Sequence, residues 1–522
     1  MRSSLSCAAD LFTTPLLCEY TADPELAVQK RLLALIDETP FLRLFHSGVG
    51  RPGWPVTVLL RSLVLQREKV WHDRELVQQL RDNARVRYLV GLPLGTRAAP
   101  SRTAIGDFRR AVVAAGLGAE LFDQQVNWLG RLPALVDPQK DDFGIDATRF
   151  EAAVAQPTII GLLQHGLRRV MLAVRSVAPQ DAEELGQRLG LAAWLRRRFQ
   201  RYGSGMQSRA ARREWSRCYR KATQLLRAIE PLRRSGLVDA AADVLQRIMD
   251  ERGPTGMDKP PDRLTNALDI EARFGCKGEG RHQITWHGGK VSVITHLATD
   301  LIVAVDLMPA NAVDGSAMAR CNDQAKALLQ GRRIRRLHGD SAYADEEHRR
   351  QMDWRETTLI GPRRGKVRRG RVPGGGRVAT KADRGKRAHI ERAQANMVRW
   401  RGNRRAWYIG LAKGLYQSAL SAYTANLARL KTLIAGGKVE LPALAWGGAA
   451  ACDGGSGARG PGPGCPCPQA RSAAPAGPLC ARRATRTAPP PPPGCILMRP
   501  APARRALYAR LFGRSPRRSC RW

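Results

Sequence analysis

The 522-residue chain contains no run of 18 consecutive apolar residues, and its first residues, MRSSLSCAADLFTT, lack the apolar core of a secretory signal. These two absences argue against a membrane-spanning helix and against an exported precursor, so we expect a soluble, cytoplasmic protein. Aromatic residues make up only 6% of the chain, and no RNP-type aromatic motif is present. RNA as the sole partner is therefore disfavoured.

The motifs of several common enzymes are also missing. No G-x4-G-K-[ST] sequence occurs, so no nucleotide cofactor is expected, and no H-E-x-x-H sequence occurs. The stretch GDSAY (339–343) is one glycine short of the nucleophile elbow of a serine hydrolase. His282, His287 and His296 have no helical ligand spacing, and no two cysteines form a C-x2-C pair, so we expect no zinc site.

Acidic residues are scarce relative to basic ones. The chain has 86 Lys and Arg against 46 Asp and Glu, which gives a net charge of +40. This excess favours a polyanionic partner, above all nucleic acid. A hydrophobic content of 43% excludes wholesale disorder. Five of the eleven cysteines are scattered through the first 435 residues, and we expect them to be reduced, inert thiols.

Residues 1–135 are expected to form a mostly helical domain. Pro55 precedes the helical pattern VTVLLRSLVLQREKV, and Gly91 stops the helical segment that follows it. Ser101 is the expected N-cap of a helix that ends at Gly116. Short helices of this kind fit a DNA-binding module of the helix-turn-helix type or a plain helical bundle, and both interpretations stay open here.

Residues 136–435 alternate between strand and helix patterns. We expect a strand in DDFGIDATRFE (141–151), helices over 160–250, and a hairpin over 284–308 that turns at Ala298–Asp300. A strand running into a turn is expected in RIRRLHGDSAY (333–343), and helix again over 386–433.

Residues 436–522 differ in kind. They hold 15 of the 33 prolines and a run of five consecutive prolines, with 14 basic and two acidic residues. Such a composition predicts a disordered Pro/Gly/Arg-rich tail. The tail is either a natural basic extension or read-through of GC-rich DNA past the end of the gene, for example after a frameshift.

Three acids stand at the ends of expected elements within a basic chain: Asp146, Asp340 and Glu391. Between residues 361 and 405 there are 16 Lys and Arg against two acids. Each acid alone would be expected to form ion pairs. If the three converge, their oxygens suit two Mg²⁺ ions about 4 Å apart, which catalyse phosphodiester displacement.

At these residues the sequence resembles the DDE transposases of bacterial insertion sequences. Four blocks carry the resemblance: GIDATRFEAAVAQPT (144–158), LDIEARFGCKG with the hairpin through 318, LHGDSAYADEEHRR (337–350) and the helical block 387–430. The helical segment 55–115 also resembles the N-terminal domain common in that family. The resemblance implies an α/β, RNase H-like catalytic domain over 136–435: a mixed five-stranded sheet flanked by helices, with a helical insert at about 160–262.

The resemblance also implies the roles of individual residues. Asp146, Asp340 and Glu391 would be the catalytic triad and would hold two Mg²⁺ ions, for which Mn²⁺ can substitute. Relatives carry a Tyr, an Arg and a Lys around the glutamate, where this chain has an arginine at 384, Arg387 and a valine at 398. We take as DNA-binding candidates the arginines of this region: Arg387, Arg399, Arg401, Arg404 and Arg405.

The implied function is transposition: binding of the terminal inverted repeats, metal-dependent cleavage and strand transfer into target DNA. The partner would be double-stranded DNA, bound by a homodimer at the nucleoid. Two alternatives stay open. One is a nuclease on the same fold, and the other is an inactive or domesticated DNA-binding protein. The insert could serve DNA contacts or dimerisation.

Overall fold

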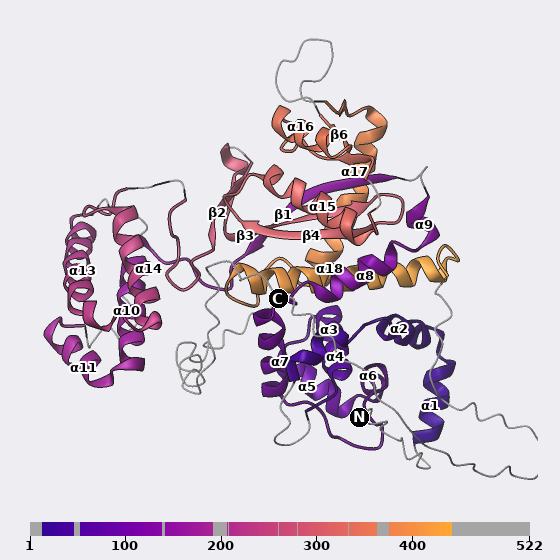
Figure 1. Cartoon of the computed structure of the whole chain (residues 1–522), viewed down its shortest axis with the longest axis horizontal. Helices are drawn as coiled ribbons and strands as arrows, with labels where there is room; N and C mark the ends of the chain where they lie inside the picture. Colours follow the sequence, from indigo (N-terminus) through magenta and orange to yellow (C-terminus); the bar gives the residue numbers. More distant parts are fainter. Residues whose placement is uncertain are drawn as a thin grey trace, which may run out of the picture. The chain divides into compact units, whose positions relative to one another are not determined.

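The computed structural model describes residues 13–45, 53–137, 141–191, 206, 208–258, 260, 262–278, 280–331, 334–362 and 375–440. Figure 1 shows the helices and strands of these ranges. Residues 441–522 lie outside the described ranges, so disorder of the tail stays a prediction. None of the helices in the described ranges is both long and apolar enough to cross a membrane.

The N-terminal region is helical, as the sequence predicts. Asp23 and Ser101 each accept a backbone hydrogen bond at the start of a helix, and Gly91 adopts a positive φ of 87° at the end of another. The helices are α1 (Thr13–Ala22), α2 (Pro24–Ala34), α3 (Thr39–Leu42), η1 (Arg43–Phe45), α4 (Val56–Lys69), α5 (Asp73–Asp82), α6 (Ala84–Val90), α7 (Arg102–Ala114), α8 (Glu120–Leu129) and α9 (Pro133–Val136).

A mixed sheet follows, and within the described residues it has seven strands rather than the expected five. The strands are β1 (Asp142–Glu151), β2 (Arg273–Lys277), β3 (Ile284–His296), β4 (Leu301–Pro309), β5 (Arg336–His338), β6 (Thr358–Gly361) and β7 (Arg377–Val378). Their order is β2-β3-β1-β5-β6-β7, with β4 paired to β3. Strands β1 to β4 pair antiparallel, whereas β5, β6 and β7 join in parallel. The expected count was wrong because β2 and β7 are short strands of five and two residues.

The hairpin is confirmed, since Asp300 turns the chain between β3 and β4 with a φ of 57°. The expected continuous helix over 386–433 is interrupted. Helix α17 (Lys381–Ala395) runs into a π-helical turn, η6 (Asn396–Trp400), and α18 (Leu411–Ala435) begins only after ten non-helical residues. The remaining elements after β2 are η4 (Gly280–His282), η5 (Asp314–Ala317), α15 (Met318–Leu328) and α16 (Glu346–Trp354).

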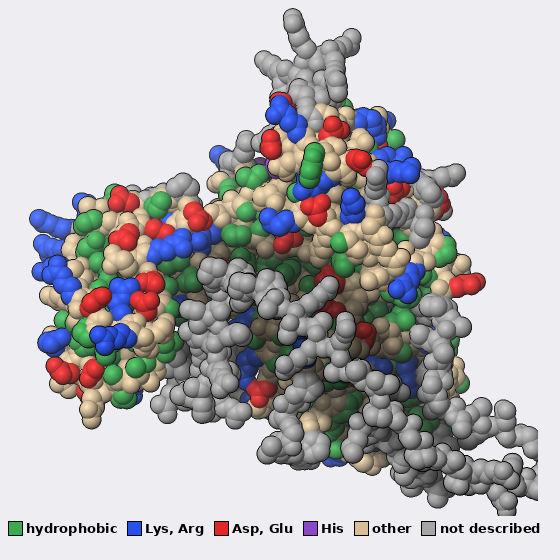
Figure 2. Space-filling model, in the orientation of Figure 1, with side chains coloured by type: hydrophobic (Ala, Val, Ile, Leu, Met, Phe, Trp, Pro, Cys, Tyr) green, Lys and Arg blue, Asp and Glu red, His purple; other side chains and the backbone are tan. Residues whose placement is uncertain are grey.

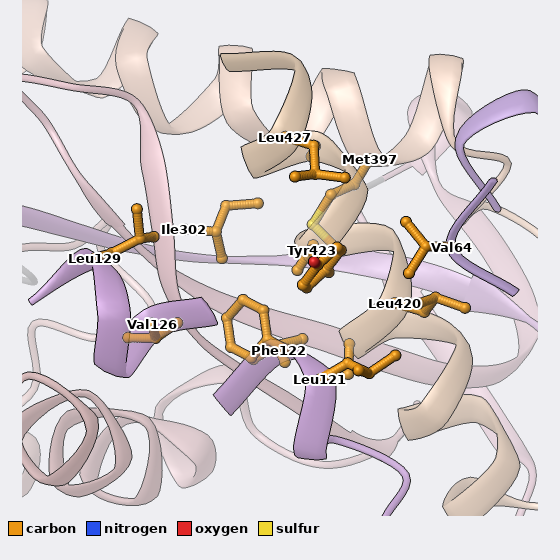
Figure 3. Packing of buried hydrophobic residues seen from close by; sticks show 14 of the residues in the cluster. Val64, Leu121, Phe122, Val126, Leu129, Ile302, Met397, Leu420, Tyr423 and Leu427 are labelled. Carbon is orange, nitrogen blue, oxygen red and sulfur yellow. The ribbon is translucent and has the colours of Figure 1, made fainter. Parts of the chain in front are cut away.

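One hydrophobic core joins the N-terminal helices to the sheet, and α18 lies at its centre. The buried cluster extends from Tyr20 to Val439. Figure 3 shows side chains of α4, α8, β4 and η6 packed around Leu420, Tyr423 and Leu427 of α18. The Nε of Arg67 donates to the Ser421 hydroxyl at 2.7 Å across the same junction. We call this body, without residues 159–258, the main body.

The helical insert has a core of its own. Its described helices are α10 (Ile159–Val177), α11 (Pro179–Arg188), α13 (Arg209–Ala228), η3 (Glu230–Leu232) and α14 (Gly236–Arg252). Buried apolar residues from Ile160 to Ala267, among them Trp215 and Leu245, form a cluster separate from the core of the main body. The insert therefore has the packing of a small independent helical unit.

Candidate active site

Two of the three candidate acids are brought together by parallel pairing of β1 and β5. The register aligns Phe143 with Leu337 and Gly144 with His338. Asp146 and Asp340 each lie two residues beyond that last aligned pair. The parallel pairing ends there, so the two carboxylates stand beside each other although 194 residues separate them in the sequence.

The environment of Asp146 is unfavourable for a negative charge. Burial raises the pKa of Asp146 to about 6, and the nearby Asp340 carboxylate pushes it further in the same direction. The Ala147 N–H, Lys277 and Arg387 oppose this rise without cancelling it. Neither carboxylate forms an ion pair with another described residue. Two adjacent acids without a paired cation are a suitable place for an external cation.

Helix α17 is held over the sheet by partly exposed ion pairs that the sequence did not reveal. Lys386 Nζ lies 2.7 Å from Asp142 Oδ2 on β1. The carboxylate of Asp300, which is buried at the β3–β4 turn, accepts hydrogen bonds from His389 Nδ1 and Arg392 Nη1, each at 2.7 Å. These contacts fix the rotation of α17 about its own axis.

Asp142 also accepts a hydrogen bond from His338 Nε2 at 3.1 Å. Burial alone would raise the pKa of Asp142, but the hydrogen bonds from Lys386 and His338 outweigh burial, and the net pKa is lowered. The pKa of His338 is lowered by its own burial, so this contact is a hydrogen bond from a neutral ring rather than an ion pair. Asp142 is a structural acid, in contrast to Asp146.

A glycine on β1 lets α17 approach the strand closely. A Cβ placed on Gly144 would lie 2.2 Å from Ile390 Cδ1, a distance that no real contact allows. Side chains alternate across a strand, so Gly144 and Asp146 share one face of the sheet. The close approach brings α17 onto the face that carries Asp146.

The third candidate, Glu391, follows Ile390 on this helix and lies one turn after Arg387, whose charge acts on Asp146. Its side chain is exposed. Among the described residues, no group of three or more His, Cys, Asp or Glu side chains is close enough to hold a metal ion. The structure therefore brings Asp146 and Asp340 together. Glu391 lies on the adjacent helix, and its carboxylate is not close enough to the two aspartates to share a metal ion with them.

Sequence reasoning missed one further polar group beside the two acids. Tyr343 is fully buried, and its hydroxyl has no hydrogen-bond partner among the described residues. Burial raises its pKa well above the ordinary value, and the charges of Asp146 and Asp340 add to the rise. The hydroxyl thus stays protonated and can donate a hydrogen bond next to the carboxylates. The only sequence signal was its place in the turn GDSAY.

The candidate DNA-binding arginines divide into two kinds. Arg401 Nη1 donates to the carbonyl of Glu68 at 2.7 Å, and Arg404 Nη1 donates to the carbonyl of Arg149 at 3.4 Å. Through these hydrogen bonds Arg401 and Arg404 connect different segments of the main body. Arg399 and Arg405 are exposed, although Arg405 Nε lies 3.4 Å from a carboxylate oxygen of Glu151.

The residues set aside as zinc ligands have structural contacts. His287 Nε2 lies 2.8 Å from the Thr265 hydroxyl, and His296 Nδ1 lies 2.8 Å from the Thr299 hydroxyl. The cysteines of the described residues, Cys18, Cys218, Cys276 and Cys321, are free thiols, as predicted. The tail cysteines lie outside the described residues.

Two stretches of the chain match family models. Residues 23–111 match a transposase domain (DUF772), and residues 258–412 match a transposase DDE domain. The second match includes Asp340 and Glu391, whereas Asp146 lies between the two matches. No curated protein and no solved structure matches the chain.

Proposed function

Since these two matches identify the chain as a relative of the DDE transposases of insertion sequences, we propose that it binds the terminal inverted repeats of its element and catalyses metal-dependent DNA cleavage and strand transfer. The observation that carries the proposal is the proximity of Asp146 and Asp340, which both lie just beyond the last parallel pair of β1 and β5. The order of five strands, β4-β3-β1-β5-β6, with the first three antiparallel and the rest parallel, supports an RNase H-like fold for residues 136–435.

The two carboxylates fit a divalent cation. Their oxygens are hard ligands of the kind that Mg²⁺ and Mn²⁺ prefer, and the raised pKa of Asp146 reflects a negative charge that lacks compensation. Asp146 and Asp340 would hold the shared ions, and Glu391 would complete a site for two of them. When bound, such ions activate an attacking oxygen and stabilise a leaving oxygen in phosphodiester displacement.

The other residues of the site would bind and orient the DNA. Arg387, with its positive charge beside Asp146, is suited to a non-bridging phosphate oxygen at the reacting position. The Tyr343 hydroxyl would donate a hydrogen bond to one carboxylate and so fix its orientation. Arg399 and Arg405, exposed beyond α17, would contact the backbone on either side.

A change in the position of the Glu391 side chain would be required for it to join the two aspartates. The ion pairs of Lys386 with Asp142 and of Arg392 with Asp300 allow rotamer changes of Glu391 without displacement of the helix. We therefore propose that binding of the cation and the DNA changes the rotamer of Glu391 and brings its carboxylate to the two aspartates. The N-terminal helices (1–135) would bind the element ends, and a DNA-bound homodimer would bring two ends together.

The test is a cleavage-and-joining assay with full-length protein, the terminal DNA of the host element, and Mg²⁺ or Mn²⁺. Wild-type protein should give a joined product that depends on the metal. Asp340→Asn should lose both cleavage and joining while it still binds the ends. Asp250→Asn, an exposed aspartate on α14, is the matched control and should remain active. Joining of DNA by the Asp340→Asn variant at the wild-type rate would refute the assignment of Asp146 and Asp340 as catalytic residues.

The same assay separates a second candidate function. The exposed side chain of Glu391 and the valine at 398 also fit a non-catalytic copy that only binds DNA. If wild-type protein binds the element ends without cleaving them, the result would favour a non-catalytic DNA-binding protein. Cleavage without joining would indicate a nuclease. A chain truncated after residue 435 should behave as the full chain does if the tail is dispensable.

A further inference from the structure

The insert carries an arginine stripe that neither family match covers. We define the stripe as Arg209, Arg213, Arg220 and Arg227 of α13, and we propose that it binds the phosphate backbone of duplex DNA without sequence preference. This inference rests on the proposed function, because it takes duplex DNA to be the substrate of the whole chain.

The geometry of α13 puts the four arginines on one line. Successive members are separated by four, seven and seven residues, which correspond to nearly whole turns of an α-helix. The buried residues Ala211, Trp215, Cys218, Ala222 and Leu225 occupy the opposite side of the helix. All four arginines are exposed, so the stripe faces directly away from the core of the insert.

The stripe lacks the acids that an ordinary solvated helix face would carry. None of its four members makes an ion pair with a described residue. The single acid of α13, Glu214, is engaged by Arg217 Nη2 at 2.7 Å. A surface helix that needed only solubility would mix both charge signs in pairs three or four residues apart. The stripe instead keeps like charges together at a cost in repulsion.

Charge is segregated within the insert as a whole. Acidic side chains collect on two other helices of the insert: Asp181, Glu183 and Glu184 of α11, and Asp239, Asp243, Asp250 and Glu251 of α14. Arg233, just outside α13, is neutralised by Asp239 and Asp243 at 2.8 and 2.7 Å. Figure 2 shows Lys and Arg side chains gathered over α13 at the left edge of the view. One helix of the insert is thus specialised for contact with an anion.

The dimensions suit a nucleic-acid backbone rather than a small anion. Eighteen residues separate the first and last arginines, so the stripe is about 27 Å long at the helical rise of 1.5 Å per residue. Duplex DNA presents phosphates continuously over such a length, and arginine binds them with two parallel hydrogen bonds. Contacts of this type carry no sequence information. The stripe is therefore suited to holding DNA of any sequence.

The test measures the affinity of full-length protein for a duplex of random sequence over a range of salt concentrations. The triple variant Arg213→Gln/Arg220→Gln/Arg227→Gln should lower the salt slope of log K by about two to three and weaken binding at least about tenfold at 0.1 M salt. The control triple Arg175→Gln/Arg188→Gln/Arg234→Gln removes the same charge from exposed positions elsewhere in the insert. It should change the slope by less than about one.

Two further measurements keep the outcomes distinct. If the triple variant does not fold, the single variant Arg220→Gln should still lower the slope by about one. Sedimentation of wild type and triple variant detects the other reading, in which the acidic helices of a second copy bind the stripe. Loss of a dimer with an unchanged salt slope would overturn the DNA proposal.

Failure of this inference is separable from failure of the proposed function. An unchanged slope in a protein that still cleaves element ends would refute the stripe alone. A reduced slope in a protein that never cleaves would support the stripe and refute the enzymatic proposal. Absence of any duplex binding by wild-type protein would refute both.

Discussion

The main body and the helical insert leave opposite charges without partners. In the main body, the half-buried Asp142 and the buried Asp300 are paired with Lys386, His389 and Arg392, while Asp146 and Asp340 have no such partner among the described residues. In the insert most acids lie on α11 and α14, and the four arginines of the stripe on α13 make no ion pair with a described residue. Uncompensated negative charge suits a cation, and uncompensated positive charge suits phosphate. The contrast separates a place for chemistry from a place for holding the substrate.

The largest expected effect comes from Asp146→Asn. Removal of the carboxylate should reduce cleavage at least about a thousandfold, roughly 4 kcal/mol in the barrier, because a neutral amide cannot neutralise the cation. The folded protein should at the same time gain about 1–3 kcal/mol at pH 7, since burial now disfavours the ionised group and holds its pKa near 6.

Asp142→Asn, four residues earlier on the same strand, is the matched variant. It should lose stability, because Lys386 and His338 would lose an ionised partner. Thermal unfolding and cleavage of both variants check the contrast. Equal destabilisation by the two substitutions would show that Asp146 is a structural acid too.

The separate cores predict separate responses to cavity formation. Leu163→Ala in α10 and Leu430→Ala in α18 each remove a fully buried side chain and should cost about 2–5 kcal/mol. Hydrogen exchange should quicken only in the insert for Leu163→Ala, and in the N-terminal helices and sheet together for Leu430→Ala. Faster exchange of the sheet in Leu163→Ala would mean that the two cores fold as one.

A single methyl group should disturb the position of α17. Gly144→Ala would force Ile390 and the helix away from β1 and should cost about 1–3 kcal/mol of folding free energy, together with cleavage activity. Adding Ile390→Ala should restore part of both losses. Gly106→Ala on α7 meets no atom within 4 Å and should stabilise the protein by about 0.5–1 kcal/mol. Denaturant unfolding of the four proteins measures these differences.

The smallest expected effect is a pH response of the main body. Burial raises the pKa of Asp123 on α8 to about 6, against the lowering effect of a hydrogen bond from Gln324. The ionised form of Asp123 is therefore disfavoured in the folded state. The free energy of unfolding falls as pH rises through the window from about 4 to 6. Asp123→Asn should be more stable than wild type at pH 7. The difference should shrink by about 1 kcal/mol at pH 5. A constant difference in unfolding free energy across this range would argue that Asp123 is ionised without penalty.

Local signals made much of the fold predictable. Ser101 caps its helix, Gly91 ends another, and the turn at Ala298–Asp300 joins β3 and β4, because each depends on residues within a few positions. Strands β2, β6 and β7 were missed, since segments of two to five residues carry no usable periodicity. The interruption after Trp400 was missed as well, although Gly402 and Gly410, which both adopt a positive φ, lie within it.

The site could be predicted only in part. The sequence pattern singled out its acids, but their grouping into one site came from family resemblance, since nothing in a 194-residue spacing predicts that Asp146 and Asp340 are neighbours. Their proximity depends on the register of two parallel strands, a non-local property. The anchoring of α17 on Asp142 and Asp300 likewise depends on contacts between distant residues, and the exposed position of Glu391 follows from that packing.

Binding of Mn²⁺ to the full chain without DNA tests the central claim most directly, with free Mn²⁺ followed by electron paramagnetic resonance at pH 7. We predict that wild-type protein and Asp250→Asn bind the ion equally, that Asp146→Asn and Asp340→Asn each lose at least about tenfold in affinity, and that Glu391→Gln loses less. Equal Mn²⁺ affinity in wild type, Asp146→Asn and Asp340→Asn would contradict the assignment of the two aspartates as the cation site.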